Sequence, residues 1–493
     1  MVNSNLAYKD QVPEIVKPII NEVPLKWCSV SLSDVVSRGK RLEASVFDVE
    51  AKQARNTVLK NKYGTVDLGG VHGLIDKAYY PGRFKRIYCD NSFGEAFYLP
   101  SQMTDIYPKA DKYISALTKC DMAELKLKEN TLLLTRSGTI GTVSFVSKTT
   151  QGKVFSDDVI RVTFKNIENL GFVYAYLKSK IGNKILTTNG YGSVITHLEP
   201  EHLATVPIPD APKEIKERIH NLIVDSYSLR DESNDLIDKA TKLLIDELHL
   251  PDIRDFDVND YKKGAPVETF SVKLSNMNGR ADASYHVPIV DAIIEHLKKS
   301  AEEVTTVGDE RISADVILPG RFKRVYVEEG YGKVFIGGKQ LFELDPSNKK
   351  YLSLVHHGDR IAKQLSLHEN MTLITCSGTI GKVALVGKHW ENWTANQHII
   401  RIVPANKEIA GYLNIFLNSE YGYYLITRFT YGSVVDEIDD NHVRQIAIPL
   451  LKNKEVQKQI NDLALEANEK RYEAYKLEKQ ALRIMDDEVI YAK

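Results

Sequence analysis

Two stretches of the chain place apolar or small side chains at alternating steps of four and three residues, the spacing of helices that pack together. The first lies between Pro212 and Pro251 and contains Ile219, Leu222, Ser226, Leu229, Ser233, Leu236, Ala240 and Leu243. The second is shifted by 241 residues and contains Val456, Ile460, Leu463, Ala467, Lys470, Ala474, Leu477, Ala481 and Ile484. Neither stretch contains Gly or Pro. The pattern predicts two long helices that bury each other as a coiled coil.

The remaining chain has short β-rich runs that Gly, Pro, Asn and Asp interrupt. Runs typical of strands are residues 132–135, 142–146 and 159–164, with counterparts at 373–375, 383–386 and 399–403. A helical stretch follows each set, from Gly171 to Leu186 and from Ile409 to Ile426. This order predicts domains of the α+β (mixed α/β) class rather than a doubly wound sheet.

Short segments recur along the chain in the same order. PGRFKR occupies residues 81–86 and 319–324, SGTIG occupies 137–141 and 377–381, and YGSV occupies 191–194 and 431–434. The offsets are 238, 240 and 240 residues, so a whole domain and its helix are duplicated. We therefore expect a pseudo-two-fold axis, which makes the two long helices antiparallel.

The repeat gives the expected domain boundaries. An N-terminal extension (1–24) precedes a first globular domain (25–210) and a first long helix (211–250). A linker (251–264) leads to a second globular domain (265–450) and a second long helix (451–493).

Composition narrows the classes of protein that fit. The 493 residues are 43% apolar and 27% charged, and 65 Lys and Arg balance 66 Asp and Glu, which excludes a histone-like binder of polyanions. The four cysteines form no C-x-x-C pair, so neither a disulfide scaffold nor a thiolate zinc site is expected. The N-terminus lacks the apolar core of a signal peptide, and no apolar run approaches the ~18 residues of a membrane span. We expect a cytoplasmic protein that does not bind membranes.

The sequence contains no recognisable catalytic machinery. It lacks a G-x-x-x-x-G-K-[ST] loop, a G-x-G-x-x-G segment after a strand, an Asn-Pro-Pro-Tyr segment and clustered His and Cys residues. Asp210, Glu214 and Lys216 resemble the carboxylates and lysine of a metal-dependent nuclease. They are too close in sequence to lie on separate strands, and we interpret them as a charged helix N-terminus. The chain is therefore predicted to have no catalytic residue, no metal and no cofactor of its own.

PGRFKR is the strongest candidate for contact with nucleic acid. Its three cations are Arg83, Lys85 and Arg86 in the first copy, and Arg321, Lys323 and Arg324 in the second. Arg can grip a phosphate or a guanine edge with two hydrogen bonds, and Lys supplies a point charge. A solvated strand entry would have the same composition, but retention of all three cations in both copies favours DNA contact.

The other motifs supply weaker candidates. Arg136 precedes SGTIG and could reach a phosphate, although the second copy has Cys376 there and a tight hairpin also explains the glycines. YGSV could contact DNA or fix a turn. The further DNA-binding candidates are Arg136, Tyr191, Ser193, Lys339, Gln340, Tyr431 and Ser433.

The order of these segments resembles the specificity subunit of type I restriction–modification systems. SGTIG is followed by NQHIIRI (residues 396–402), then by Gly-Ser-Val, then by an Ile-Pro pair and a long helix. The resemblance covers nearly the whole chain, in both copies. The first copy departs from it with FSDD at 155–158, where the second has ANQH at 395–398, so no role is transferred to the first domain from Asn396 or Gln397.

The resemblance implies two target-recognition domains that each read half of a split double-stranded DNA sequence, held apart by two antiparallel helices. It also implies two methyltransferase (modification) subunits that bring S-adenosylmethionine, and restriction/translocase subunits that bring ATP and Mg²⁺. The candidate partner-binding residues on the helices are Ile215, Ile219, Leu222, Leu236, Val456, Ile460, Leu463 and Leu477.

Two other functions stay open. The chain could be a duplicated protein–protein scaffold that does not read DNA, or the recognition subunit of a combined restriction–methylation enzyme. The cation triplets favour DNA reading over the scaffold. Residues 51–80 and 342–372 differ most between the copies, so we expect two different half-sites and an asymmetric DNA site.

Overall fold

The computed structural model describes residues 29–492 except 38–39, 41, 43, 193–194, 257, 259–268 and 278. Several predictions fall partly or wholly outside these residues. They are the N-terminal extension, the start of the first domain at residue 25, the end of the linker with the boundary at residue 265, the DNA-contact candidate Ser193 and the last residue of the second long helix.

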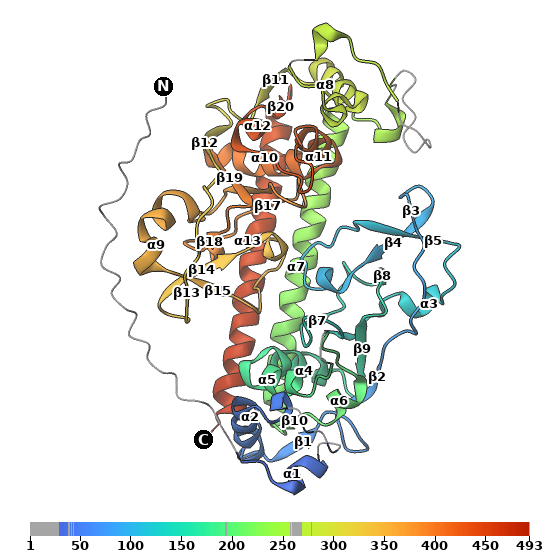
Figure 1. The fold of residues 1–493 in the computed structure, drawn as a ribbon, viewed down its shortest axis with the longest axis vertical. Coiled ribbons are helices and arrows are strands. Elements are labelled where there is room, and N and C mark those ends of the chain that lie inside the picture. The colour runs from blue at the N-terminus through green and yellow to red at the C-terminus, as the bar shows by residue number, and fades with distance from the viewer. Residues whose placement is uncertain are drawn as a thin grey trace, which may run out of the picture.

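Two long helices form the spine of the molecule (Figure 1). α7 (Lys213–Glu247) and α13 (Lys454–Ile484) lie side by side, and a π-helical turn (Met485–Ile490) extends α13. Arg218 near the start of α7 pairs with Glu488 after the end of α13 at 2.9 Å, whereas Glu232 pairs with Lys470 at 2.7 Å. Residue numbers thus rise along one helix as they fall along the other, which confirms the predicted antiparallel pair.

The contact between these helices confirms the small residues of the predicted seam and corrects the leucines of α7. Small buried residues recur every seven positions, and they are Ser226, Ser233 and Ala240 on α7 and Ala467, Ala474 and Ala481 on α13. The Ser226 hydroxyl donates to the Ala474 carbonyl oxygen at 2.8 Å, so the backbones approach closely. The predicted seam leucines of α7 are only half-buried, because the next residue along fills the interior instead; the buried ones are Ile223, Arg230, Ile237 and Leu244.

The first globular domain contains two four-stranded sheets. One has the antiparallel order β2 (Ile75–Tyr79), β9 (Val159–Phe164), β6 (Leu132–Thr135), β7 (Val143–Phe145). The other has the order β3 (Tyr88–Cys89), β5 (Lys112–Ser115), β4 (Gly94–Tyr98), β8 (Val154–Phe155), in which β4 and β8 are parallel. β1 (Thr65–Asp67) pairs with β10 (Pro207–Pro209).

The second domain repeats this topology strand for strand. Its first sheet is β12 (Ser313–Ile317), β19 (Ile399–Pro404), β16 (Thr372–Thr375), β17 (Val383–Leu385). Its second sheet is β13 (Tyr326–Val327), β15 (Lys350–Ser353), β14 (Gly332–Ile336), β18 (Thr394–Ala395), and β11 (Glu303–Thr306) pairs with β20 (Ala447–Leu450). The duplicated α+β architecture predicted from the repeat is confirmed.

Each predicted helical stretch is two helices. α4 (Glu168–Lys178) and α5 (Lys180–Thr188) meet at Ser179, and α10 (Lys407–Asn418) and α11 (Glu420–Thr427) meet at Ser419. Each serine has an extended backbone and accepts a hydrogen bond from a backbone N–H of the following helix, so it ends one helix and caps the next. α4 packs on α7 and α10 on α13.

Glycine permits these helices to approach the spine. A Cβ at Gly171 of α4 would lie 2.6 Å from the Cα of His220 on α7, and one at Gly411 of α10 would lie 2.4 Å from the carbonyl oxygen of Asn461 on α13. The same close approach in both repeats holds each domain against one long helix.

Each long helix ends against the helix that precedes the first strand of the other repeat. Asn61, after α2 (Val49–Leu59), donates to the Val489 and Ile490 carbonyl oxygens at 2.6 and 3.2 Å, just past α13. His296 Nε2 of α8 (Pro288–Ser300) lies 2.9 Å from the Leu248 carbonyl oxygen, just past α7. The remaining short α-helices are α1 (Leu32–Ser37), α3 (Met122–Leu125), α6 (Pro200–Ala204), α9 (Leu354–Arg360) and α12 (Asp440–Arg444).

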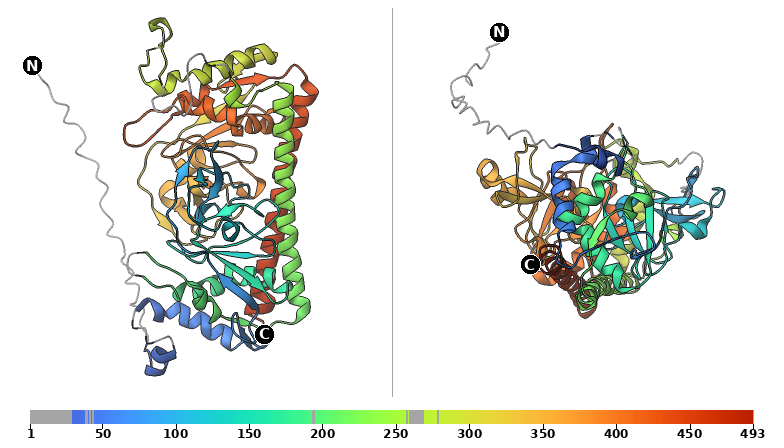
Figure 2. Two further views of the ribbon diagram at one scale, coloured as in Figure 1. Left: turned by 90° about the vertical axis from the view of Figure 1, so that its right-hand side faces the viewer. Right: turned by 90° about the horizontal axis from the view of Figure 1, so that it is seen from below.

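The two domains lie on the same side of the helix pair (Figure 2) and also touch each other. The Ile106 N–H donates to the Phe342 carbonyl oxygen at 2.8 Å, and Asp105 faces Glu343 in an antiparallel bridge. Asp105 and Glu343 occupy equivalent positions after β4 and β14, so this bridge lies at the pseudo-two-fold axis. The helices are therefore not the only connection between the domains.

The carboxyl groups at this axis bind protons unusually well. Burial raises the pKa of Asp105 to about 7, and nearby Glu343 adds to the rise while Lys382 opposes it. Burial likewise raises the pKa of Glu343 to about 7, against the effect of Lys178.

No helix among the described residues combines the length and the apolar character needed to cross a membrane.

The axial acids should make a pH-dependent contribution to stability. Between about pH 4 and 7 the folded chain holds protons on Asp105 and Glu343 that the unfolded chain has released, so this contribution falls as pH rises. Asp105→Asn combined with Glu343→Gln should remove it and raise the free energy of unfolding at pH 8 by about 1–3 kcal/mol. Chemical denaturation of both proteins at pH 5 and pH 8 measures the difference. An equal pH dependence in the two proteins would show that the acids titrate normally.

Candidate nucleic-acid interface

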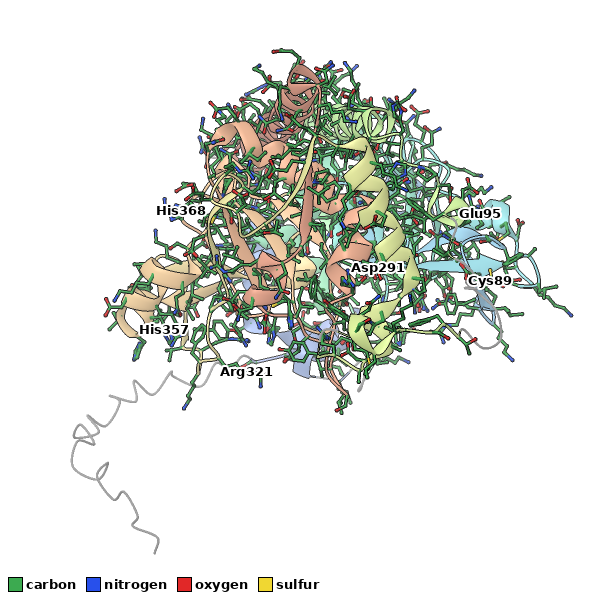
Figure 3. All side chains as sticks on the ribbon, turned by 90° about the horizontal axis from the view of Figure 1, so that it is seen from above. Cys89, Glu95, Asp291, Arg321, His357 and His368 are labelled. Atoms are coloured by element: carbon green, nitrogen blue, oxygen red, sulfur yellow. The ribbon has the colours of Figure 1, made fainter. Side chains whose placement is uncertain are left out.

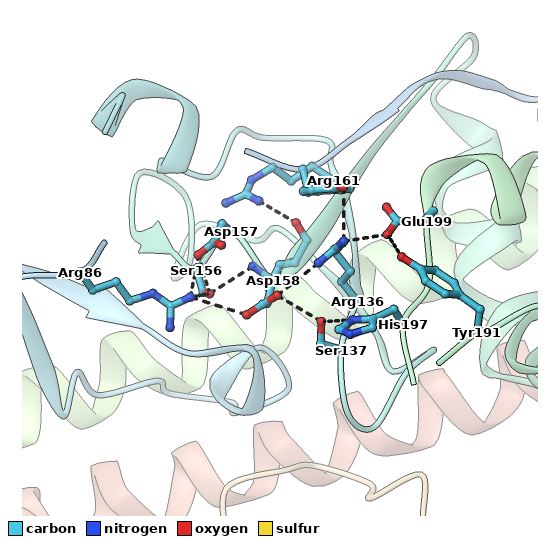
Figure 4. A network of polar contacts seen from close by, with 12 residues as sticks. Arg86, Arg136, Ser137, Ser156, Asp157, Asp158, Arg161, Tyr191, His197 and Glu199 are labelled. Atoms are coloured by element: carbon cyan, nitrogen blue, oxygen red, sulfur yellow. Dashed lines mark hydrogen bonds and ion pairs between the residues drawn. The ribbon is translucent and has the colours of Figure 1, made fainter. Parts of the chain in front are cut away.

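The three repeated motifs, far apart in sequence, converge in each domain. We call residues 81–86 and 319–324 the cation loops, and residues 191–197 and 431–437 the tyrosine loops. In the first domain, Asp158 lies between them (Figure 4): its carboxylate is 3.6 Å from Arg86 of the cation loop and accepts from the Ser137 hydroxyl at 3.1 Å. Ser137 also lies 2.9 Å from His197 Nδ1 of the tyrosine loop.

Side chains of the first cation loop alternate in direction. Arg83 and Lys85 are exposed, whereas Phe84 packs edge-on against Phe97. Arg86 is half-buried, lies over the Phe97 ring and donates to Asp157 at 2.6 Å. Burial disfavours its charge, but the Asp157 carboxylate outweighs this effect and raises the pKa of Arg86.

The second cation loop repeats the alternation. Arg321 and Lys323 are exposed, and Phe322 packs edge-on against Phe335. Arg324 lies over Phe335 and donates to the Gln397 side-chain oxygen at 2.8 Å. Of the three predicted cations, two are therefore exposed in each domain. Arg86 and Arg324 hold the loop in place, because their guanidinium groups are turned inward and paired.

Arg136 also points inward, with only 5% of its surface exposed. It donates to Glu199 at 2.7 Å and lies over the Tyr80 ring, and Glu199 in turn accepts from the Tyr191 hydroxyl at 2.6 Å. Burial alone would raise the pKa of Glu199, but the Tyr191 and Arg136 hydrogen bonds hold it below its ordinary value. Arg136 thus orients Tyr191 through Glu199 and does not present a free cation at the surface.

Cys376 occupies the equivalent place in the second domain. It is buried, and burial raises the pKa of its thiol to about 12. Its carbonyl oxygen accepts from the Ile438 N–H at 3.0 Å, as the Arg136 carbonyl oxygen accepts from the Leu198 N–H at 2.8 Å. The backbone geometry is retained where the side chain is not.

The second tyrosine loop projects from the surface. Two backbone hydrogen bonds between Tyr431 and Glu437, of 2.9 and 2.8 Å, close it. Gly432 has a φ of +116°, and a Cβ there would lie 2.1 Å from the Val435 carbonyl oxygen, so the turn requires glycine. Ser433 is exposed at its tip, beside a half-exposed Tyr431.

Arg321 links this loop to the cation loop. Its guanidinium lies 3.0 Å from a Glu437 carboxylate oxygen, yet its side chain remains 79% exposed. The exposed cations and the tyrosine loop of the second domain therefore form one surface, which lies on the side away from the long helices (Figure 3).

Gln340 and Lys339 differ in orientation. The Gln340 side chain accepts from the Gly337 N–H at 3.0 Å and donates to the Asn348 carbonyl oxygen at 3.2 Å, so it closes a turn in its own domain. Gln102 makes the equivalent contacts in the first domain. Lys339 is exposed.

Of the predicted partner-binding residues, three are not available on the surface. Ile219, Ile460 and Leu463 are buried in the chain's own cores. The half-buried ones, along the sides of the helices, are Ile215, Leu222, Leu236, Val456 and Leu477.

The suspected nuclease-like residues form a local ion pair. Lys216 donates to Asp210 at 2.7 Å at the start of α7. Among the described residues, no group of three or more His, Cys, Asp or Glu side chains could hold a metal ion.

Two buried arginines were missed as site residues. Arg161 on β9 donates to the carbonyl oxygens of Val159, Phe155 and Leu125 at 2.7, 3.1 and 3.2 Å. Arg401 on β19 bonds the equivalent carbonyl oxygens. Burial lowers the pKa of Arg161 to about 10 and that of Arg401 to about 9. The sequence signal was an arginine between apolar strand residues in both copies, VIRV and IIRI.

These arginines should stabilise the segments that hold Asp157 and Gln397. Arg161→Met and Arg401→Met each leave several buried carbonyl oxygens without a partner, so each should lower the free energy of unfolding by about 2–4 kcal/mol. Denaturant titration measures this, with exposed Lys323→Met as the control that changes stability by under ~0.5 kcal/mol. Unchanged stability in both arginine variants would contradict the assigned role.

Comparison with solved structures finds similar chains at low identity. The S subunit of a type I restriction–modification system from M. genitalium is 12% identical, with 87% of this chain and 95% of that chain covered and a TM-score of 0.33. The HsdS subunit from Thermoanaerobacter tengcongensis is 12% identical, with 86% and 100% covered and a TM-score of 0.26. A chain from a study of complex assembly and conformational transition of the type I R-M system is 13% identical, with 86% and 96% covered and a TM-score of 0.26. No curated protein matches the chain.

A sequence profile of the type I restriction modification DNA specificity domain matches residues 108–234 and residues 331–467. The matches fall one in each repeat and together cover more than half of the chain. This protein therefore belongs to the DNA specificity family of type I restriction–modification systems.

Proposed function

We propose that each globular domain binds double-stranded DNA through its cation loop and its tyrosine loop, and that together they read a bipartite site. The observation that carries this proposal is the repeated geometry of the cation loops. In both domains an inward Phe and Arg fix the loop, and they leave Arg83 and Lys85, or Arg321 and Lys323, exposed. Exposed Arg and Lys on a fixed loop suit phosphate and guanine contacts.

The two half-sites should differ. The inward Arg86 pairs with a carboxylate, Asp157, whereas Arg324 pairs with an amide, Gln397. The local charge beside the two cation loops is therefore different, which favours different DNA sequences at the two domains.

The spine limits the distance between the half-sites. α7 has 35 residues, which span about 52 Å at ~1.5 Å per residue. This length corresponds to about 15 base pairs of B-DNA, and we propose it as the upper limit for the separation of the half-site centres. The contact between the domains at the axis favours a shorter distance.

We assign no catalytic step to this chain. Methylation and restriction are proposed to belong to partner subunits, which would bring S-adenosylmethionine, ATP and Mg²⁺. Two methyltransferase subunits fit a duplicated spine, and we place their contacts on the half-buried flank of the helices, at Leu222 and Leu236 and at Val456 and Leu477. We also propose that restriction/translocase subunits join this complex and that the protein is cytoplasmic.

A second candidate is a scaffold that binds two protein partners and no DNA. The half-buried leucines along α7 favour protein partners in either case, so only DNA binding separates the two functions. If the chain were instead the recognition subunit of a combined restriction–methylation enzyme, it would use the same DNA surface.

The cation loops can be tested in the assembled complex. Arg321→Ala combined with Lys323→Ala should weaken DNA binding and reduce the slope of log affinity against log salt by up to about 2 units. Lys298→Ala removes an exposed cation on α8 and serves as the control. Affinity and salt slope equal to wild type in the double variant would rule out this loop as a phosphate contact and favour the scaffold.

The asymmetry of the site can be tested in cells. Methylation mapping in a host with and without this gene, together with its methyltransferase gene, should give a split motif whose two halves differ. A palindromic motif would contradict the proposed difference between the domains.

A further inference from the structure

The two domains differ most clearly in the segment that follows β5 and β15. Ser115 and Ser353 end these strands opposite Gly94 and Gly332, an offset of 238 residues. The next equivalent bridges, Lys126 to Val154 and Ser366 to Thr394, are offset by 240. The second domain thus has two extra residues between Ser353 and Ser366.

The extra residues extend a helix. In the first domain the segment is a turn followed by the one-turn helix α3. In the second domain α9 runs directly into a π-helical turn (Ile361–Leu365), so that twelve consecutive residues are helical. A π-helical turn is rare and is frequent at functional sites.

This helix is fixed to the cation loop of its own domain. Ile361 and Leu365 are buried against Phe335, and Phe322 of the cation loop packs on the same cluster. Arg360 donates to the Gly320 carbonyl oxygen at 3.2 Å and lies over the Phe322 ring.

His357 adds a third connection. Its Nε2 accepts from the Val325 N–H at 3.2 Å, directly after the cation loop, and its ring packs against Phe322. Figure 3 shows His357 and Arg321 near each other, on the side away from the long helices. The helix and the exposed cations therefore form one rigid surface.

The outer face of the helix is exposed and chemically mixed. Val355 is 90% exposed and Leu354 is 42% exposed. Asp359 and Lys363 follow Val355 at steps of four residues and are exposed too, as is His356. Aliphatic carbon, a carboxylate and an ammonium group on one face can contact a thymine methyl, a cytosine amino group and a guanine edge, respectively.

We infer that α9 and its π-helical turn are the base-reading helix of the second domain, which enters the major groove while Arg321 and Lys323 hold the flanking phosphates. This inference rests on the proposed DNA-binding function of that domain. Twelve helical residues are about 18 Å long, and the major groove, about 12 Å wide, admits a helix. The three cations Arg321, Lys323 and Lys363 complement the phosphates on either side of the groove.

The first domain must then read its half-site with a different element. Leu117 is the counterpart of Val355 and is 75% exposed, but it lies on a turn rather than on a helix. A helix in one domain and a turn in the other present different side chains to DNA, which gives a structural reason for two different half-sites.

The test uses the chain assembled with its methyltransferase subunits and a library of double-stranded DNA randomised at both half-sites. Val355→Ala and Asp359→Asn should each change base preference at one or two positions of one half-site by about 5- to 100-fold. Preference at the other half-site should stay as in wild type. Leu117→Ala is the matched control, because it lies outside the second domain and should leave that domain's half-site unchanged. All three side chains are exposed, and circular dichroism and complex assembly verify folding.

Two results would overturn the inference. One is an unchanged base preference in both α9 variants and in their combination. The other is an equal loss of affinity for every sequence, which would mark α9 as a non-specific contact. In either case, loss of affinity in Arg321→Ala with Lys323→Ala would leave the proposed DNA-binding function intact. Full DNA binding in that double variant as well would instead count against the proposed function itself.

Discussion

The antiparallel packing of α7 on α13 is the contact on which the rest of the structure depends. Its small-residue seam repeats every seven positions, so the seam alone would fit nearly as well after a shift of one heptad. A buried ionic cluster removes this freedom. Glu478 of α13 is 1% exposed and accepts from Arg230 of α7 at 2.8 Å, from Lys178 at 2.6 Å and from the Tyr174 hydroxyl at 2.5 Å. Burial opposes its ionisation, yet Lys178 and Arg230 hold the pKa of Glu478 at about 2. A shifted register would leave buried charges unpaired, which costs about 3–5 kcal/mol.

The same cluster places the first domain, because Tyr174 and Lys178 belong to α4. Register and domain position are therefore set by one group of side chains. In the second domain, an uncharged contact has the corresponding role: the Asn461 side chain of α13 accepts from the Gly411 N–H of α10 at 2.9 Å. The domains then meet at Asp105 and Glu343, so the separation of the two candidate DNA surfaces depends on the spine and on this axial contact together.

The sequence predicted the repeat, the two helices and six of the described strands (β6, β7, β9, β16, β17 and β19), because these depend on local periodicity and on duplication. β6 and β9 begin and end where they were expected. On α7 the leucines of the seam were predicted one position off, since a buried Arg230 does not resemble a core residue in a hydrophobic pattern. The inward turn of Arg86 and Arg136 could not be predicted either, because their partners Asp157 and Glu199 are distant in sequence.

The candidate sites of the two domains share one backbone frame but carry different side chains. Arg136 and Cys376 make the same backbone hydrogen bonds. The Arg136 N–H donates to the Asp158 carbonyl oxygen at 3.1 Å, and the Cys376 N–H donates to the His398 carbonyl oxygen at 3.0 Å. The buried Arg161 and Arg401 also bond to backbone carbonyl oxygens alone. Since the frame depends on backbone atoms and on two buried arginines, the side chains proposed to face DNA can differ without loss of the fold. A duplicated chain can therefore present two different recognition surfaces on one symmetric spine.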